Sequence, residues 1–242
     1  MEAIRLEDLT KVYKDLVAVD HLTLSIPKGE LFSLLGVNGA GKTTTIKMLS
    51  CLTQPTEGTA YLQGQSIIDA PSAVKAMIAL SPQETAVAPG LSVYENLAFM
   101  CGVHSIPKAK RGEKITELLS LLRLQSVAKQ KAGKLSGGYQ RRLSIAMALI
   151  SEPEILFLDE PTLGLDVLAR SELWDLIRSL KGKVTIILTT HYMEEAEALS
   201  DRVGIMKDGK LLVCDTPSNI KQLAGTDRFE EAFVRILKGV VQ

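Results

Sequence analysis

Apolar and polar positions alternate with the period of a β-strand near the start of the chain. Residues 3–9 and 17–26 place apolar side chains at alternating positions. The continuous apolar run 31–35 follows, and such a run is typical of a strand that is buried on both faces. A glycine-rich stretch and an expected helix over 42–51 come next. The chain is therefore predicted to open with an antiparallel β layer ahead of its first buried strand.

From residue 151 onwards, apolar runs of strand length alternate with helical patterns. The run 155–158, bounded by Pro153 and Asp159, predicts a central parallel strand. Further elements are expected as strands at 59–62, 77–80, 184–188, 203–206 and 211–214, and as helices at 167–180, 192–199, 217–223 and 229–237. This alternation predicts an α/β fold with a mostly parallel sheet and helices on both of its faces.

The middle of the chain has a different pattern. Ser92 and Glu95 form a capping box, and helical apolar spacing continues from there to Cys101. A second helix is expected over 108–122, and a third begins at Ser136. Three helices without an intervening strand predict an all-helical lobe that is inserted into the α/β frame.

The glycine-rich stretch after the first buried strand has the spacing G-x-x-x-x-G-K-T. Its residues are Gly36, Val37, Asn38, Gly39, Ala40, Gly41, Lys42, Thr43 and Thr44. Glycines let successive backbone N–H groups point at one anion, and the following helix adds the positive end of its dipole. Lys42 can reach the terminal phosphates, and the Thr43 hydroxyl can hold Mg²⁺. The alternative is an ordinary glycine-rich turn, but glycines, lysine, hydroxyl and strand-before-helix context together predict nucleoside triphosphate binding.

An acidic pair ends the strand that is expected at 155–158. Asp159 and Glu160 follow its carboxyl end, which is where open α/β sheets bind their ligands. Asp159 can hold the Mg²⁺ placed by Thr43, directly or through water, and Glu160 can polarise the attacking water beside the γ-phosphate. Taken alone, the pair would equally fit an acidic turn. With the phosphate loop in the same chain, Mg²⁺ needs a second anchor and hydrolysis needs a base.

Composition narrows the range of partners. The chain holds 28 Lys+Arg and 28 Asp+Glu, and this neutral balance argues against nucleic acid. The cysteines Cys51, Cys101 and Cys214 lie far apart, which fits a reducing cytosol and excludes a metal knuckle or disulfide framework. The start lacks the pattern of a signal peptide, and no apolar run approaches the ~18–20 residues that span a bilayer. Any membrane span is therefore expected from another chain.

A second candidate anion site opens the third helix of the lobe. The run Leu135-Ser136-Gly137-Gly138-Tyr139-Gln140 places a serine and two glycines at a helix start, upstream of Asp159-Glu160-Pro161. This motif and its order resemble the signature of ATP-binding cassette (ABC) proteins. In that family, the signature of one subunit closes over the ATP that the other subunit holds, in a head-to-tail dimer. The alternative is a plain helix N-cap.

The resemblance to the ABC family covers nearly the whole chain. It implies a single ABC ATPase domain over 1–242, with a P-loop NTPase fold. In this arrangement, a RecA-like core with its β layer occupies 1–83 and 151–242, and a helical signature lobe occupies 84–150.

The same resemblance implies roles for further residues. Tyr13 lies where an aromatic side chain stacks on adenine, and Gln83 matches a glutamine that touches Mg²⁺ and the attacking water. His191 matches the switch histidine that contacts the γ-phosphate, and the run 163–166 resembles the loop that crosses the dimer interface. The alternatives are a strand-edge tyrosine, a solvated loop glutamine and a structural or surface histidine.

Two positions depart from the family pattern. Tyr139 stands where the signature most often has glutamine, and Gly164 stands where the interface loop more usually has alanine. The phosphate contacts of the signature come from Ser136 and from backbone N–H groups, so the first change affects only contacts of the glutamine side chain. Because Lys42, the acidic pair and His191 are all present, an active ATPase is predicted.

The resemblance predicts an ATP- and Mg²⁺-dependent motor subunit of a transporter. Its expected partners are a second ABC ATPase subunit, identical or different, and separate integral membrane permease subunits. The chain is then expected in the cytoplasm, attached to the inner face of the membrane through the permease. The run 227–239 resembles the ending of ATPases paired with ABC-2 exporter permeases, and the appended domain of many sugar importers is missing, so export is expected. The alternative for 227–239 is an amphipathic helix that caps its own domain.

Other functional classes remain as alternatives. A soluble ABC ATPase in DNA repair or chromosome organisation would carry long coiled coils between Lys42 and Ser136, and no long heptad run is found there. A translation factor of the family usually holds two cassettes in one chain. A GTP-binding switch would carry an N-K-x-D motif, which the sequence lacks.

Overall fold

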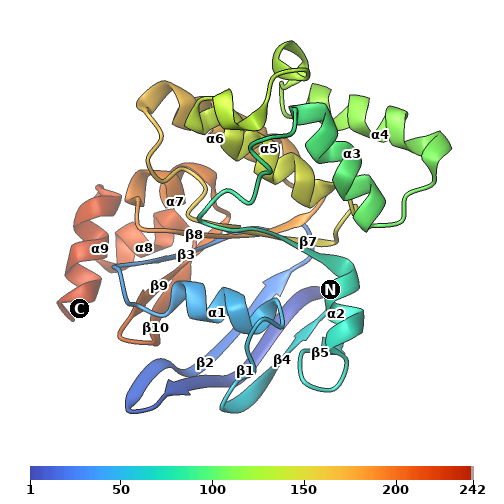
Figure 1. Cartoon of the computed structure of the whole chain (residues 1–242). Helices are drawn as coiled ribbons and strands as arrows, with labels where there is room; N and C mark the ends of the chain where they lie inside the picture. Colours follow the sequence, from blue (N-terminus) through green and yellow to red (C-terminus); the bar gives the residue numbers. More distant parts are fainter. Residues whose placement is uncertain (241–242) are drawn as a thin grey trace.

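The larger of two β-sheets forms the centre of the molecule in the computed structural model, which describes residues 1–240 (Figure 1). This sheet has six strands in the order β10-β9-β3-β8-β7-β6. They are β3 (Leu31–Gly36), β6 (Ile78–Ser81), β7 (Ile155–Asp159), β8 (Thr185–Thr190), β9 (Arg202–Lys207) and β10 (Lys210–Asp215). The strands from β9 to β6 are parallel, whereas β10 pairs antiparallel with β9. The predicted mostly parallel sheet is confirmed.

The central strands of this sheet carry the candidate site residues to one edge. Every residue of β3, β7 and β8 is buried, as their continuous apolar runs predict. Leu35 of β3 is level with Thr190 of β8, and Thr189 of β8 is level with Asp159 of β7. Parallel strands end at the same edge, so the glycine-rich stretch after β3 and the acidic pair at the end of β7 come together.

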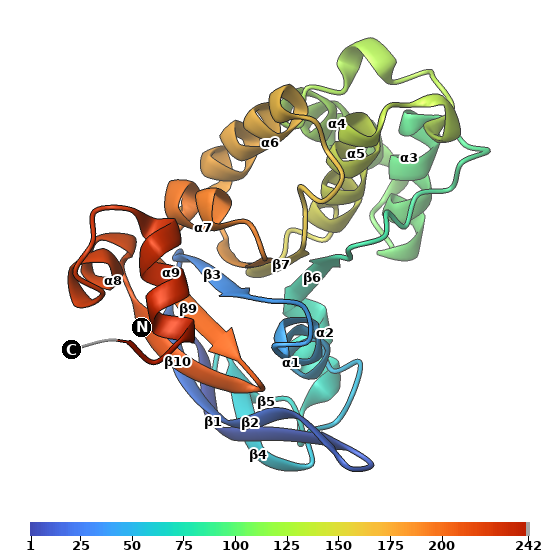
Figure 2. The same cartoon turned by 90° about the vertical axis from the view of Figure 1, so that its left-hand side faces the viewer.

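The smaller sheet is the antiparallel layer that the N-terminal alternation predicts. Its order is β2-β1-β4-β5, with β1 (Glu2–Tyr13), β2 (Leu16–Pro27), β4 (Glu57–Leu62) and β5 (Gln65–Ser66). Helix α1 (Lys42–Leu49) lies between the two sheets in Figures 1 and 2. Its Ile46 and Met48 join a buried cluster that also contains Ile4 of the smaller sheet and Phe157 of the larger one. This apolar contact fixes α1 against both layers.

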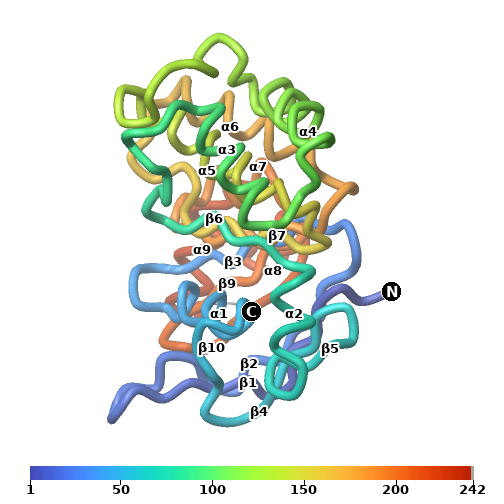
Figure 3. Tube along the Cα trace, turned by 45° about the vertical axis from the view of Figure 1, so that its right-hand side comes forward, coloured from blue at the N-terminus to red at the C-terminus, as the bar shows by residue number. Residues whose placement is uncertain are grey.

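A helical segment connects β6 to β7. It comprises α3 (Val93–Val103), α4 (Lys108–Leu121), the 3₁₀ turns η1 (Gln125–Val127) and η2 (Ala132–Lys134), and α5 (Gly137–Leu149). The trace in Figure 3 leaves the larger sheet at β6 and returns to it at β7. Leu97 and Leu143 of this segment share one buried cluster with Leu173 of α6 (Val167–Leu180) and Leu188 of β8. The predicted capping box is present, because Ser92 and Glu95 bond each other's backbone N–H groups.

The last helices of the chain cover the β9–β10 side of the larger sheet. They are α7 (Met193–Leu199), α8 (Pro217–Leu223) and α9 (Phe229–Leu237). Phe229, Phe233 and Ile236 of α9 are at most 6% exposed and pack into a cluster with Ile205 of β9 and Ile220 of α8. Helix α9 therefore caps its own domain, as the alternative interpretation of 227–239 holds.

Several element boundaries differ from the sequence-based expectation. Helix α2 (Pro71–Met77) was not predicted. Because Met77 belongs to this helix, the next strand begins at Ile78 and not at Met77 as expected. The helix is short and starts with a proline, which suits a first helical turn but leaves little periodicity to detect. Helix α1 ends at Leu49 and not at Cys51, because Cys51 adopts a left-handed φ of 54°.

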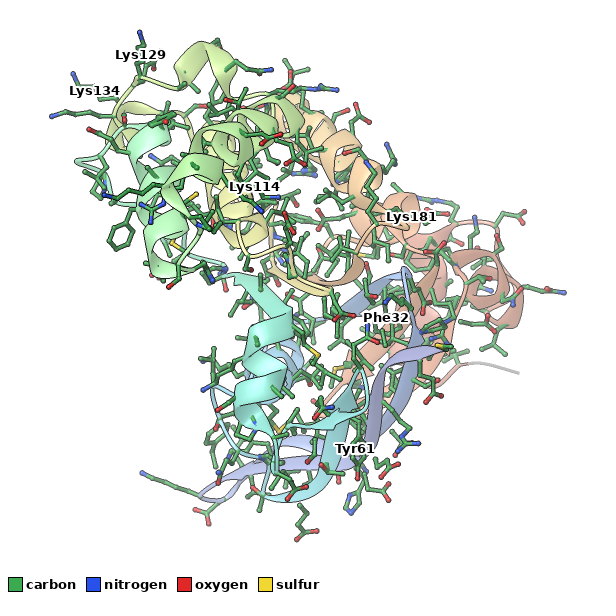
Figure 4. All side chains as sticks on the ribbon, turned by 90° about the vertical axis from the view of Figure 1, so that its right-hand side faces the viewer. Phe32, Tyr61, Lys114, Lys129, Lys134 and Lys181 are labelled. Atoms are coloured by element: carbon green, nitrogen blue, oxygen red, sulfur yellow. The ribbon has the colours of Figure 1, made fainter. Side chains whose placement is uncertain are left out.

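Several lysines of the helical segment lie on solvated faces. Lys129 and Lys134 project outward from the end of the helical segment in Figure 4, and Lys108 and Lys110 are also exposed. Within residues 1–240, no helix combines the length and hydropathy that a membrane crossing requires.

Candidate active site

The glycine-rich stretch forms a tight loop between β3 and α1. A Cβ atom at Gly36 would lie 2.5 Å from the Met206 carbonyl oxygen, and one at Gly41 would lie 2.4 Å from the Ala18 carbonyl oxygen. Gly41 also has a φ of 104° at the N-cap of α1, where other residues would be strained. Glycine is therefore required at both positions to bring the backbone close to neighbouring strands.

A cavity of about 650 Å³ opens at this loop. It is lined by the predicted site residues Tyr13, Asn38, Gly39, Ala40, Gly41, Lys42, Thr43, Thr44, Gln83, Glu160 and His191. Four further lining residues were not predicted, namely Leu16, Val17, Ala18 and Asp208, and a fifth, Leu163, was expected in the loop that crosses the dimer interface. The structure thus brings most of the predicted residues, from five separate chain segments, to one cavity.

Lys42 is buried at the base of this cavity. Its side chain is 6% exposed, and Nζ donates to the carbonyl oxygens of Gly36 at 2.7 Å and Val37 at 3.2 Å. Nζ also lies 3.7 Å from Oε1 of Glu160. Burial lowers the pKa of Lys42, and the nearby carboxylates of Glu160 and Asp159 offset part of that effect. The loop therefore holds a preplaced ammonium group where an anion would enter.

Thr43 and Asp159 bring two oxygen ligands together from different elements. The Thr43 hydroxyl donates to Oδ1 of Asp159 at 3.3 Å, and the Thr189 hydroxyl donates to the same oxygen. Mg²⁺ prefers such hydroxyl and carboxylate oxygens, and it usually completes its shell with water and substrate phosphates. Within residues 1–240, no group of three or more His, Cys, Asp or Glu side chains could hold a metal by itself. The donor set at Thr43 and Asp159 fits an ion that arrives with phosphate.

Glu160 and His191 meet across the ends of β7 and β8. Oε2 of Glu160 is hydrogen-bonded to Nδ1 of His191, and the Glu160 side chain is 8% exposed. Glu160 adopts a left-handed φ of 48°, and its N–H donates to both the carbonyl and the hydroxyl of Thr189 at 3.1 Å. A non-glycine residue in this conformation is strained, and such strain gathers at functional sites.

The outer part of the cavity has an aromatic and apolar wall. The Tyr13 ring is 42% exposed, and Nζ of Lys11 lies 5.0 Å from its centroid. Leu16 and Val17 are 66% and 44% exposed, which is high for apolar side chains. In the sequence, Val17 is an ordinary position of the strand expected at 17–26 and Leu16 directly precedes it, so the apolar pattern does not mark either residue as part of a site. An exposed ring beside exposed aliphatic side chains suits the flat face of a base.

The signature residues do not line this cavity. Ser136 is the N-cap of α5, and both it and Gly137 are exposed. A Cβ atom at Gly138 would lie 3.1 Å from Cβ of Ala169 in α6, so glycine permits close packing of α5 on α6. The Asp166 side chain caps α6 by accepting from the Ala169 N–H at 2.9 Å. Gly164 has a φ of 75°, which explains a glycine where alanine is usual.

A protein-family model described as ABC transporter matches residues 19–163, which is more than half of the chain. The chain belongs to the ABC transporter family. The match extends from the smaller sheet through the glycine loop and the signature to the acidic pair. Family membership confirms the predicted family and the predicted ATP-hydrolysing enzyme class.

Curated relatives of this ABC protein match along almost its entire length. YbhF of Escherichia coli, named a probable multidrug ABC transporter ATP-binding protein, is 38% identical over 97% of the chain. DrrA of Mycobacterium tuberculosis, named a doxorubicin resistance ATP-binding protein, is 39% identical over 92% of the chain. The chain spans 41% of the length of YbhF and 67% of that of DrrA.

A solved structure supports the fold class of the ABC chain. It is a dimeric ATP-binding cassette in a post-hydrolysis state with ADP and Pi bound. The TM-score is 0.78 at 28% sequence identity, and the match covers 88% of this chain and 98% of the other. The predicted α/β fold with a P-loop core, an antiparallel β layer and helices is thereby confirmed.

Proposed function

We propose that this chain is the ATP-hydrolysing motor subunit of an ABC exporter. The observation that carries the proposal is one cavity in which Lys42, Glu160 and His191 meet within hydrogen-bond or ion-pair distance. Lys42 and the loop N–H groups bind the phosphates, and Tyr13 stacks on the adenine. Glu160 takes a proton from the attacking water, while His191 orients Glu160 and contacts the γ-phosphate.

Mg²⁺ fits this proposal as the metal partner of ATP. Thr43 and Asp159 would hold it through their oxygens, and Gln83, which also lines the cavity, would contribute its side-chain amide oxygen. When bound, the ion would neutralise charge on the phosphates. The side chains of the chain itself perform the remaining work of positioning phosphate and water.

The working unit in this proposal is a head-to-tail dimer. Ser136 and Gly137 are exposed at a helix start, and they lie outside the cavity of their own chain. A second subunit, identical or different, would receive them over its own ATP, as the dimeric form of the related cassette supports. Each chain then completes the site of its partner with a set of N–H groups.

Separate membrane permease subunits are the proposed partners whose conformational changes this ATPase drives. The helical segment beyond Gln83 exposes apolar side chains on α3, namely Tyr94 at 43%, Phe99 at 60% and Val103 at 59%. Exposed apolar groups of this size suit a protein interface. The names of YbhF and DrrA support export of an organic compound. The chain would then act in the cytoplasm, at the inner face of the membrane.

Purification of the full chain from detergent-solubilised membranes tests this assignment. We expect stoichiometric recovery with a polytopic membrane protein, and a higher ATP turnover in that complex than in the free chain. Replacement of Phe99 by Asp should reduce recovery of the permease while ATP binding persists, and Tyr61→Asp on the smaller sheet is the matched control. Recovery with ribosomes or DNA in place of a membrane protein would support the soluble alternative in translation or DNA repair.

A further inference from the structure

Two consecutive arginines of α5 face different parts of the molecule. Arg141 is 4% exposed, and its two terminal nitrogens donate to the carbonyl oxygens of Pro82 at 2.6 Å and Gln83 at 2.5 Å. Arg142 forms an ion pair with Glu172 of α6 instead. Only the first arginine therefore joins α5 to the segment that carries Gln83.

A second buried contact comes from the same face of α5. The hydroxyl oxygens of Ser144 and Ser81 lie 3.0 Å apart, and these residues are 6% and 1% exposed. Residues three positions apart lie on one face of a helix, so Arg141 and Ser144 hold the same neighbour. Helix α5 is thus bonded to each of the residues from Ser81 to Gln83.

The other end of the segment that follows Gln83 is held by α3. Asn96 is 1% exposed, accepts from the Ala88 N–H at 2.8 Å, and donates to the Ser92 carbonyl at 2.9 Å. Gln83 itself is exposed and lines the cavity. Gln83 therefore borders the cavity while its backbone carbonyl accepts a hydrogen bond from the helical segment.

The chemistry of the contact favours arginine over any other residue. Burying a guanidinium costs free energy unless its N–H groups are hydrogen-bonded, and here two adjacent carbonyl oxygens accept from its two terminal nitrogens. Within residues 1–240, Arg141 has no carboxylate within ion-pair distance, and burial lowers its pKa, with Asp159 and Glu195 offsetting part of the effect. Lysine carries a single ammonium group and cannot reproduce this planar fork.

We propose that Arg141 is a positioning residue that couples the two ATP sites of the dimer. Helix α5 begins with the signature, which the proposed function places over the ATP of the partner. The same helix holds the backbone of Gln83, which faces the ATP of its own chain. A shift of α5 when the signature engages the partner site therefore moves Gln83. This inference rests on the proposed head-to-tail dimer.

Hydrogen exchange in the full chain tests the coupling. A Glu160→Gln chain with ATP would hold the closed dimer, and Glu160→Gln with Ser136→Arg would bind ATP without closure. In the closed dimer, we expect the amides of residues 84–88 to exchange at least about threefold more slowly than in the blocked chain, which is the Glu160→Gln, Ser136→Arg double variant. Adding Arg141→Lys or Arg141→Gln should remove that difference while the dimer still forms.

Arg111→Gln is the matched control, because Arg111 also donates from a guanidinium to a backbone carbonyl, that of Ile106 at 2.8 Å, within the helical segment. It should keep the full difference in exchange. Equal protection of residues 84–88 in the closed and blocked chains would overturn the proposal, as would protection that survives in both Arg141 variants. Failure of both variants to fold would also count against it, since Arg141 would then serve stability. Absence of any closed dimer with ATP would instead overturn the proposed function.

Discussion

Glu160 and His191 are joined by a hydrogen bond between Oε2 of the carboxylate and Nδ1 of the imidazole, although 31 positions separate them in the chain. Adjacent parallel strands bring them together, because Asp159 of β7 is level with Thr189 of β8. The other carboxylate oxygen, Oε1, lies 3.7 Å from Nζ of Lys42. One carboxylate thus links the imidazole to the ammonium group of the glycine loop, and we expect the three side chains to act as a unit.

A double-mutant cycle tests the joint action of Glu160 and His191. Loss of a positioned general base lowers turnover by about 10²–10⁴-fold, so Glu160→Gln should reduce phosphate release to that extent. His191→Ala should also be slow, because Glu160 loses its orienting partner. The double variant should be at most about tenfold slower than the worse single variant, since groups that act together are not additive. Multiplicative losses would show that the two side chains act independently.

Metal removal should separate binding from hydrolysis. With EDTA, the chain should retain ATP through Lys42 and the loop but release no phosphate. Asp159→Asn should require roughly tenfold more Mg²⁺ for half-maximal turnover, because one charged oxygen ligand is lost. Thr116→Ala removes a hydroxyl that bonds the Gly112 carbonyl in α4, and it should leave the Mg²⁺ requirement unchanged. An unaltered requirement in Asp159→Asn would exclude this carboxylate as a ligand.

Tyr13 should contribute to ATP binding more than to chemistry. Stacking of an aromatic side chain adds about 0.5–1.5 kcal/mol, so Tyr13→Ala should raise the Kd of ATP by roughly two- to twelvefold. Turnover at saturating ATP should change little, and Tyr13→Phe should behave like the original chain. Tyr61 lies under the Arg5 guanidinium at 4.8 Å, outside the cavity, so Tyr61→Ala is the control. Equal nucleotide binding in Tyr13→Ala and Tyr61→Ala would remove Tyr13 from the site.

Local sequence patterns predict the parts of this protein that depend on near neighbours in the chain. The spacing of 36–44 requires a glycine turn before a helix, and the apolar run 155–158 requires a buried strand. The local pattern does not predict that Leu16 and Val17 line the cavity, because distant segments of the chain build that cavity. Arg141 is likewise hidden, since only the fold brings the Pro82 and Gln83 carbonyls to it.

Glu195 is another residue whose environment the sequence does not disclose. In the sequence it belongs to an acidic run at the start of an expected helix, which would ordinarily be solvated. In the structure it is 0% exposed, and Oε1 accepts from Nε1 of Trp174 at 3.0 Å. Burial raises the pKa of its carboxyl above the ordinary value of 4.5, and the charge of Glu160 adds to that rise.

This raised pKa makes the stability of the chain depend on pH. The folded state holds the proton of Glu195 more tightly than the unfolded state does. The resulting stabilisation is fully present below pH 4.5 and is lost as the pH rises through the folded-state pKa. Glu195→Gln keeps the Trp174 hydrogen bond without a charge. The Tm of this variant, relative to that of the original chain, should therefore increase as the pH rises from 5 to 8. The gain should be about 2–4 °C for each 1 kcal/mol relieved. A pH-independent difference in Tm would contradict the buried-carboxyl account.

In the proposed dimer, each chain contributes half of each of the two ATP sites. Static light scattering of Glu160→Gln with and without Ser136→Arg measures this directly. We predict a dimer with ATP and Mg²⁺, a monomer with ADP, and a monomer with bound ATP once Ser136 is replaced by arginine. A Glu160→Gln chain that binds ATP and stays monomeric at every concentration would contradict this shared-site arrangement, and so would a dimer that persists in the Ser136→Arg variant.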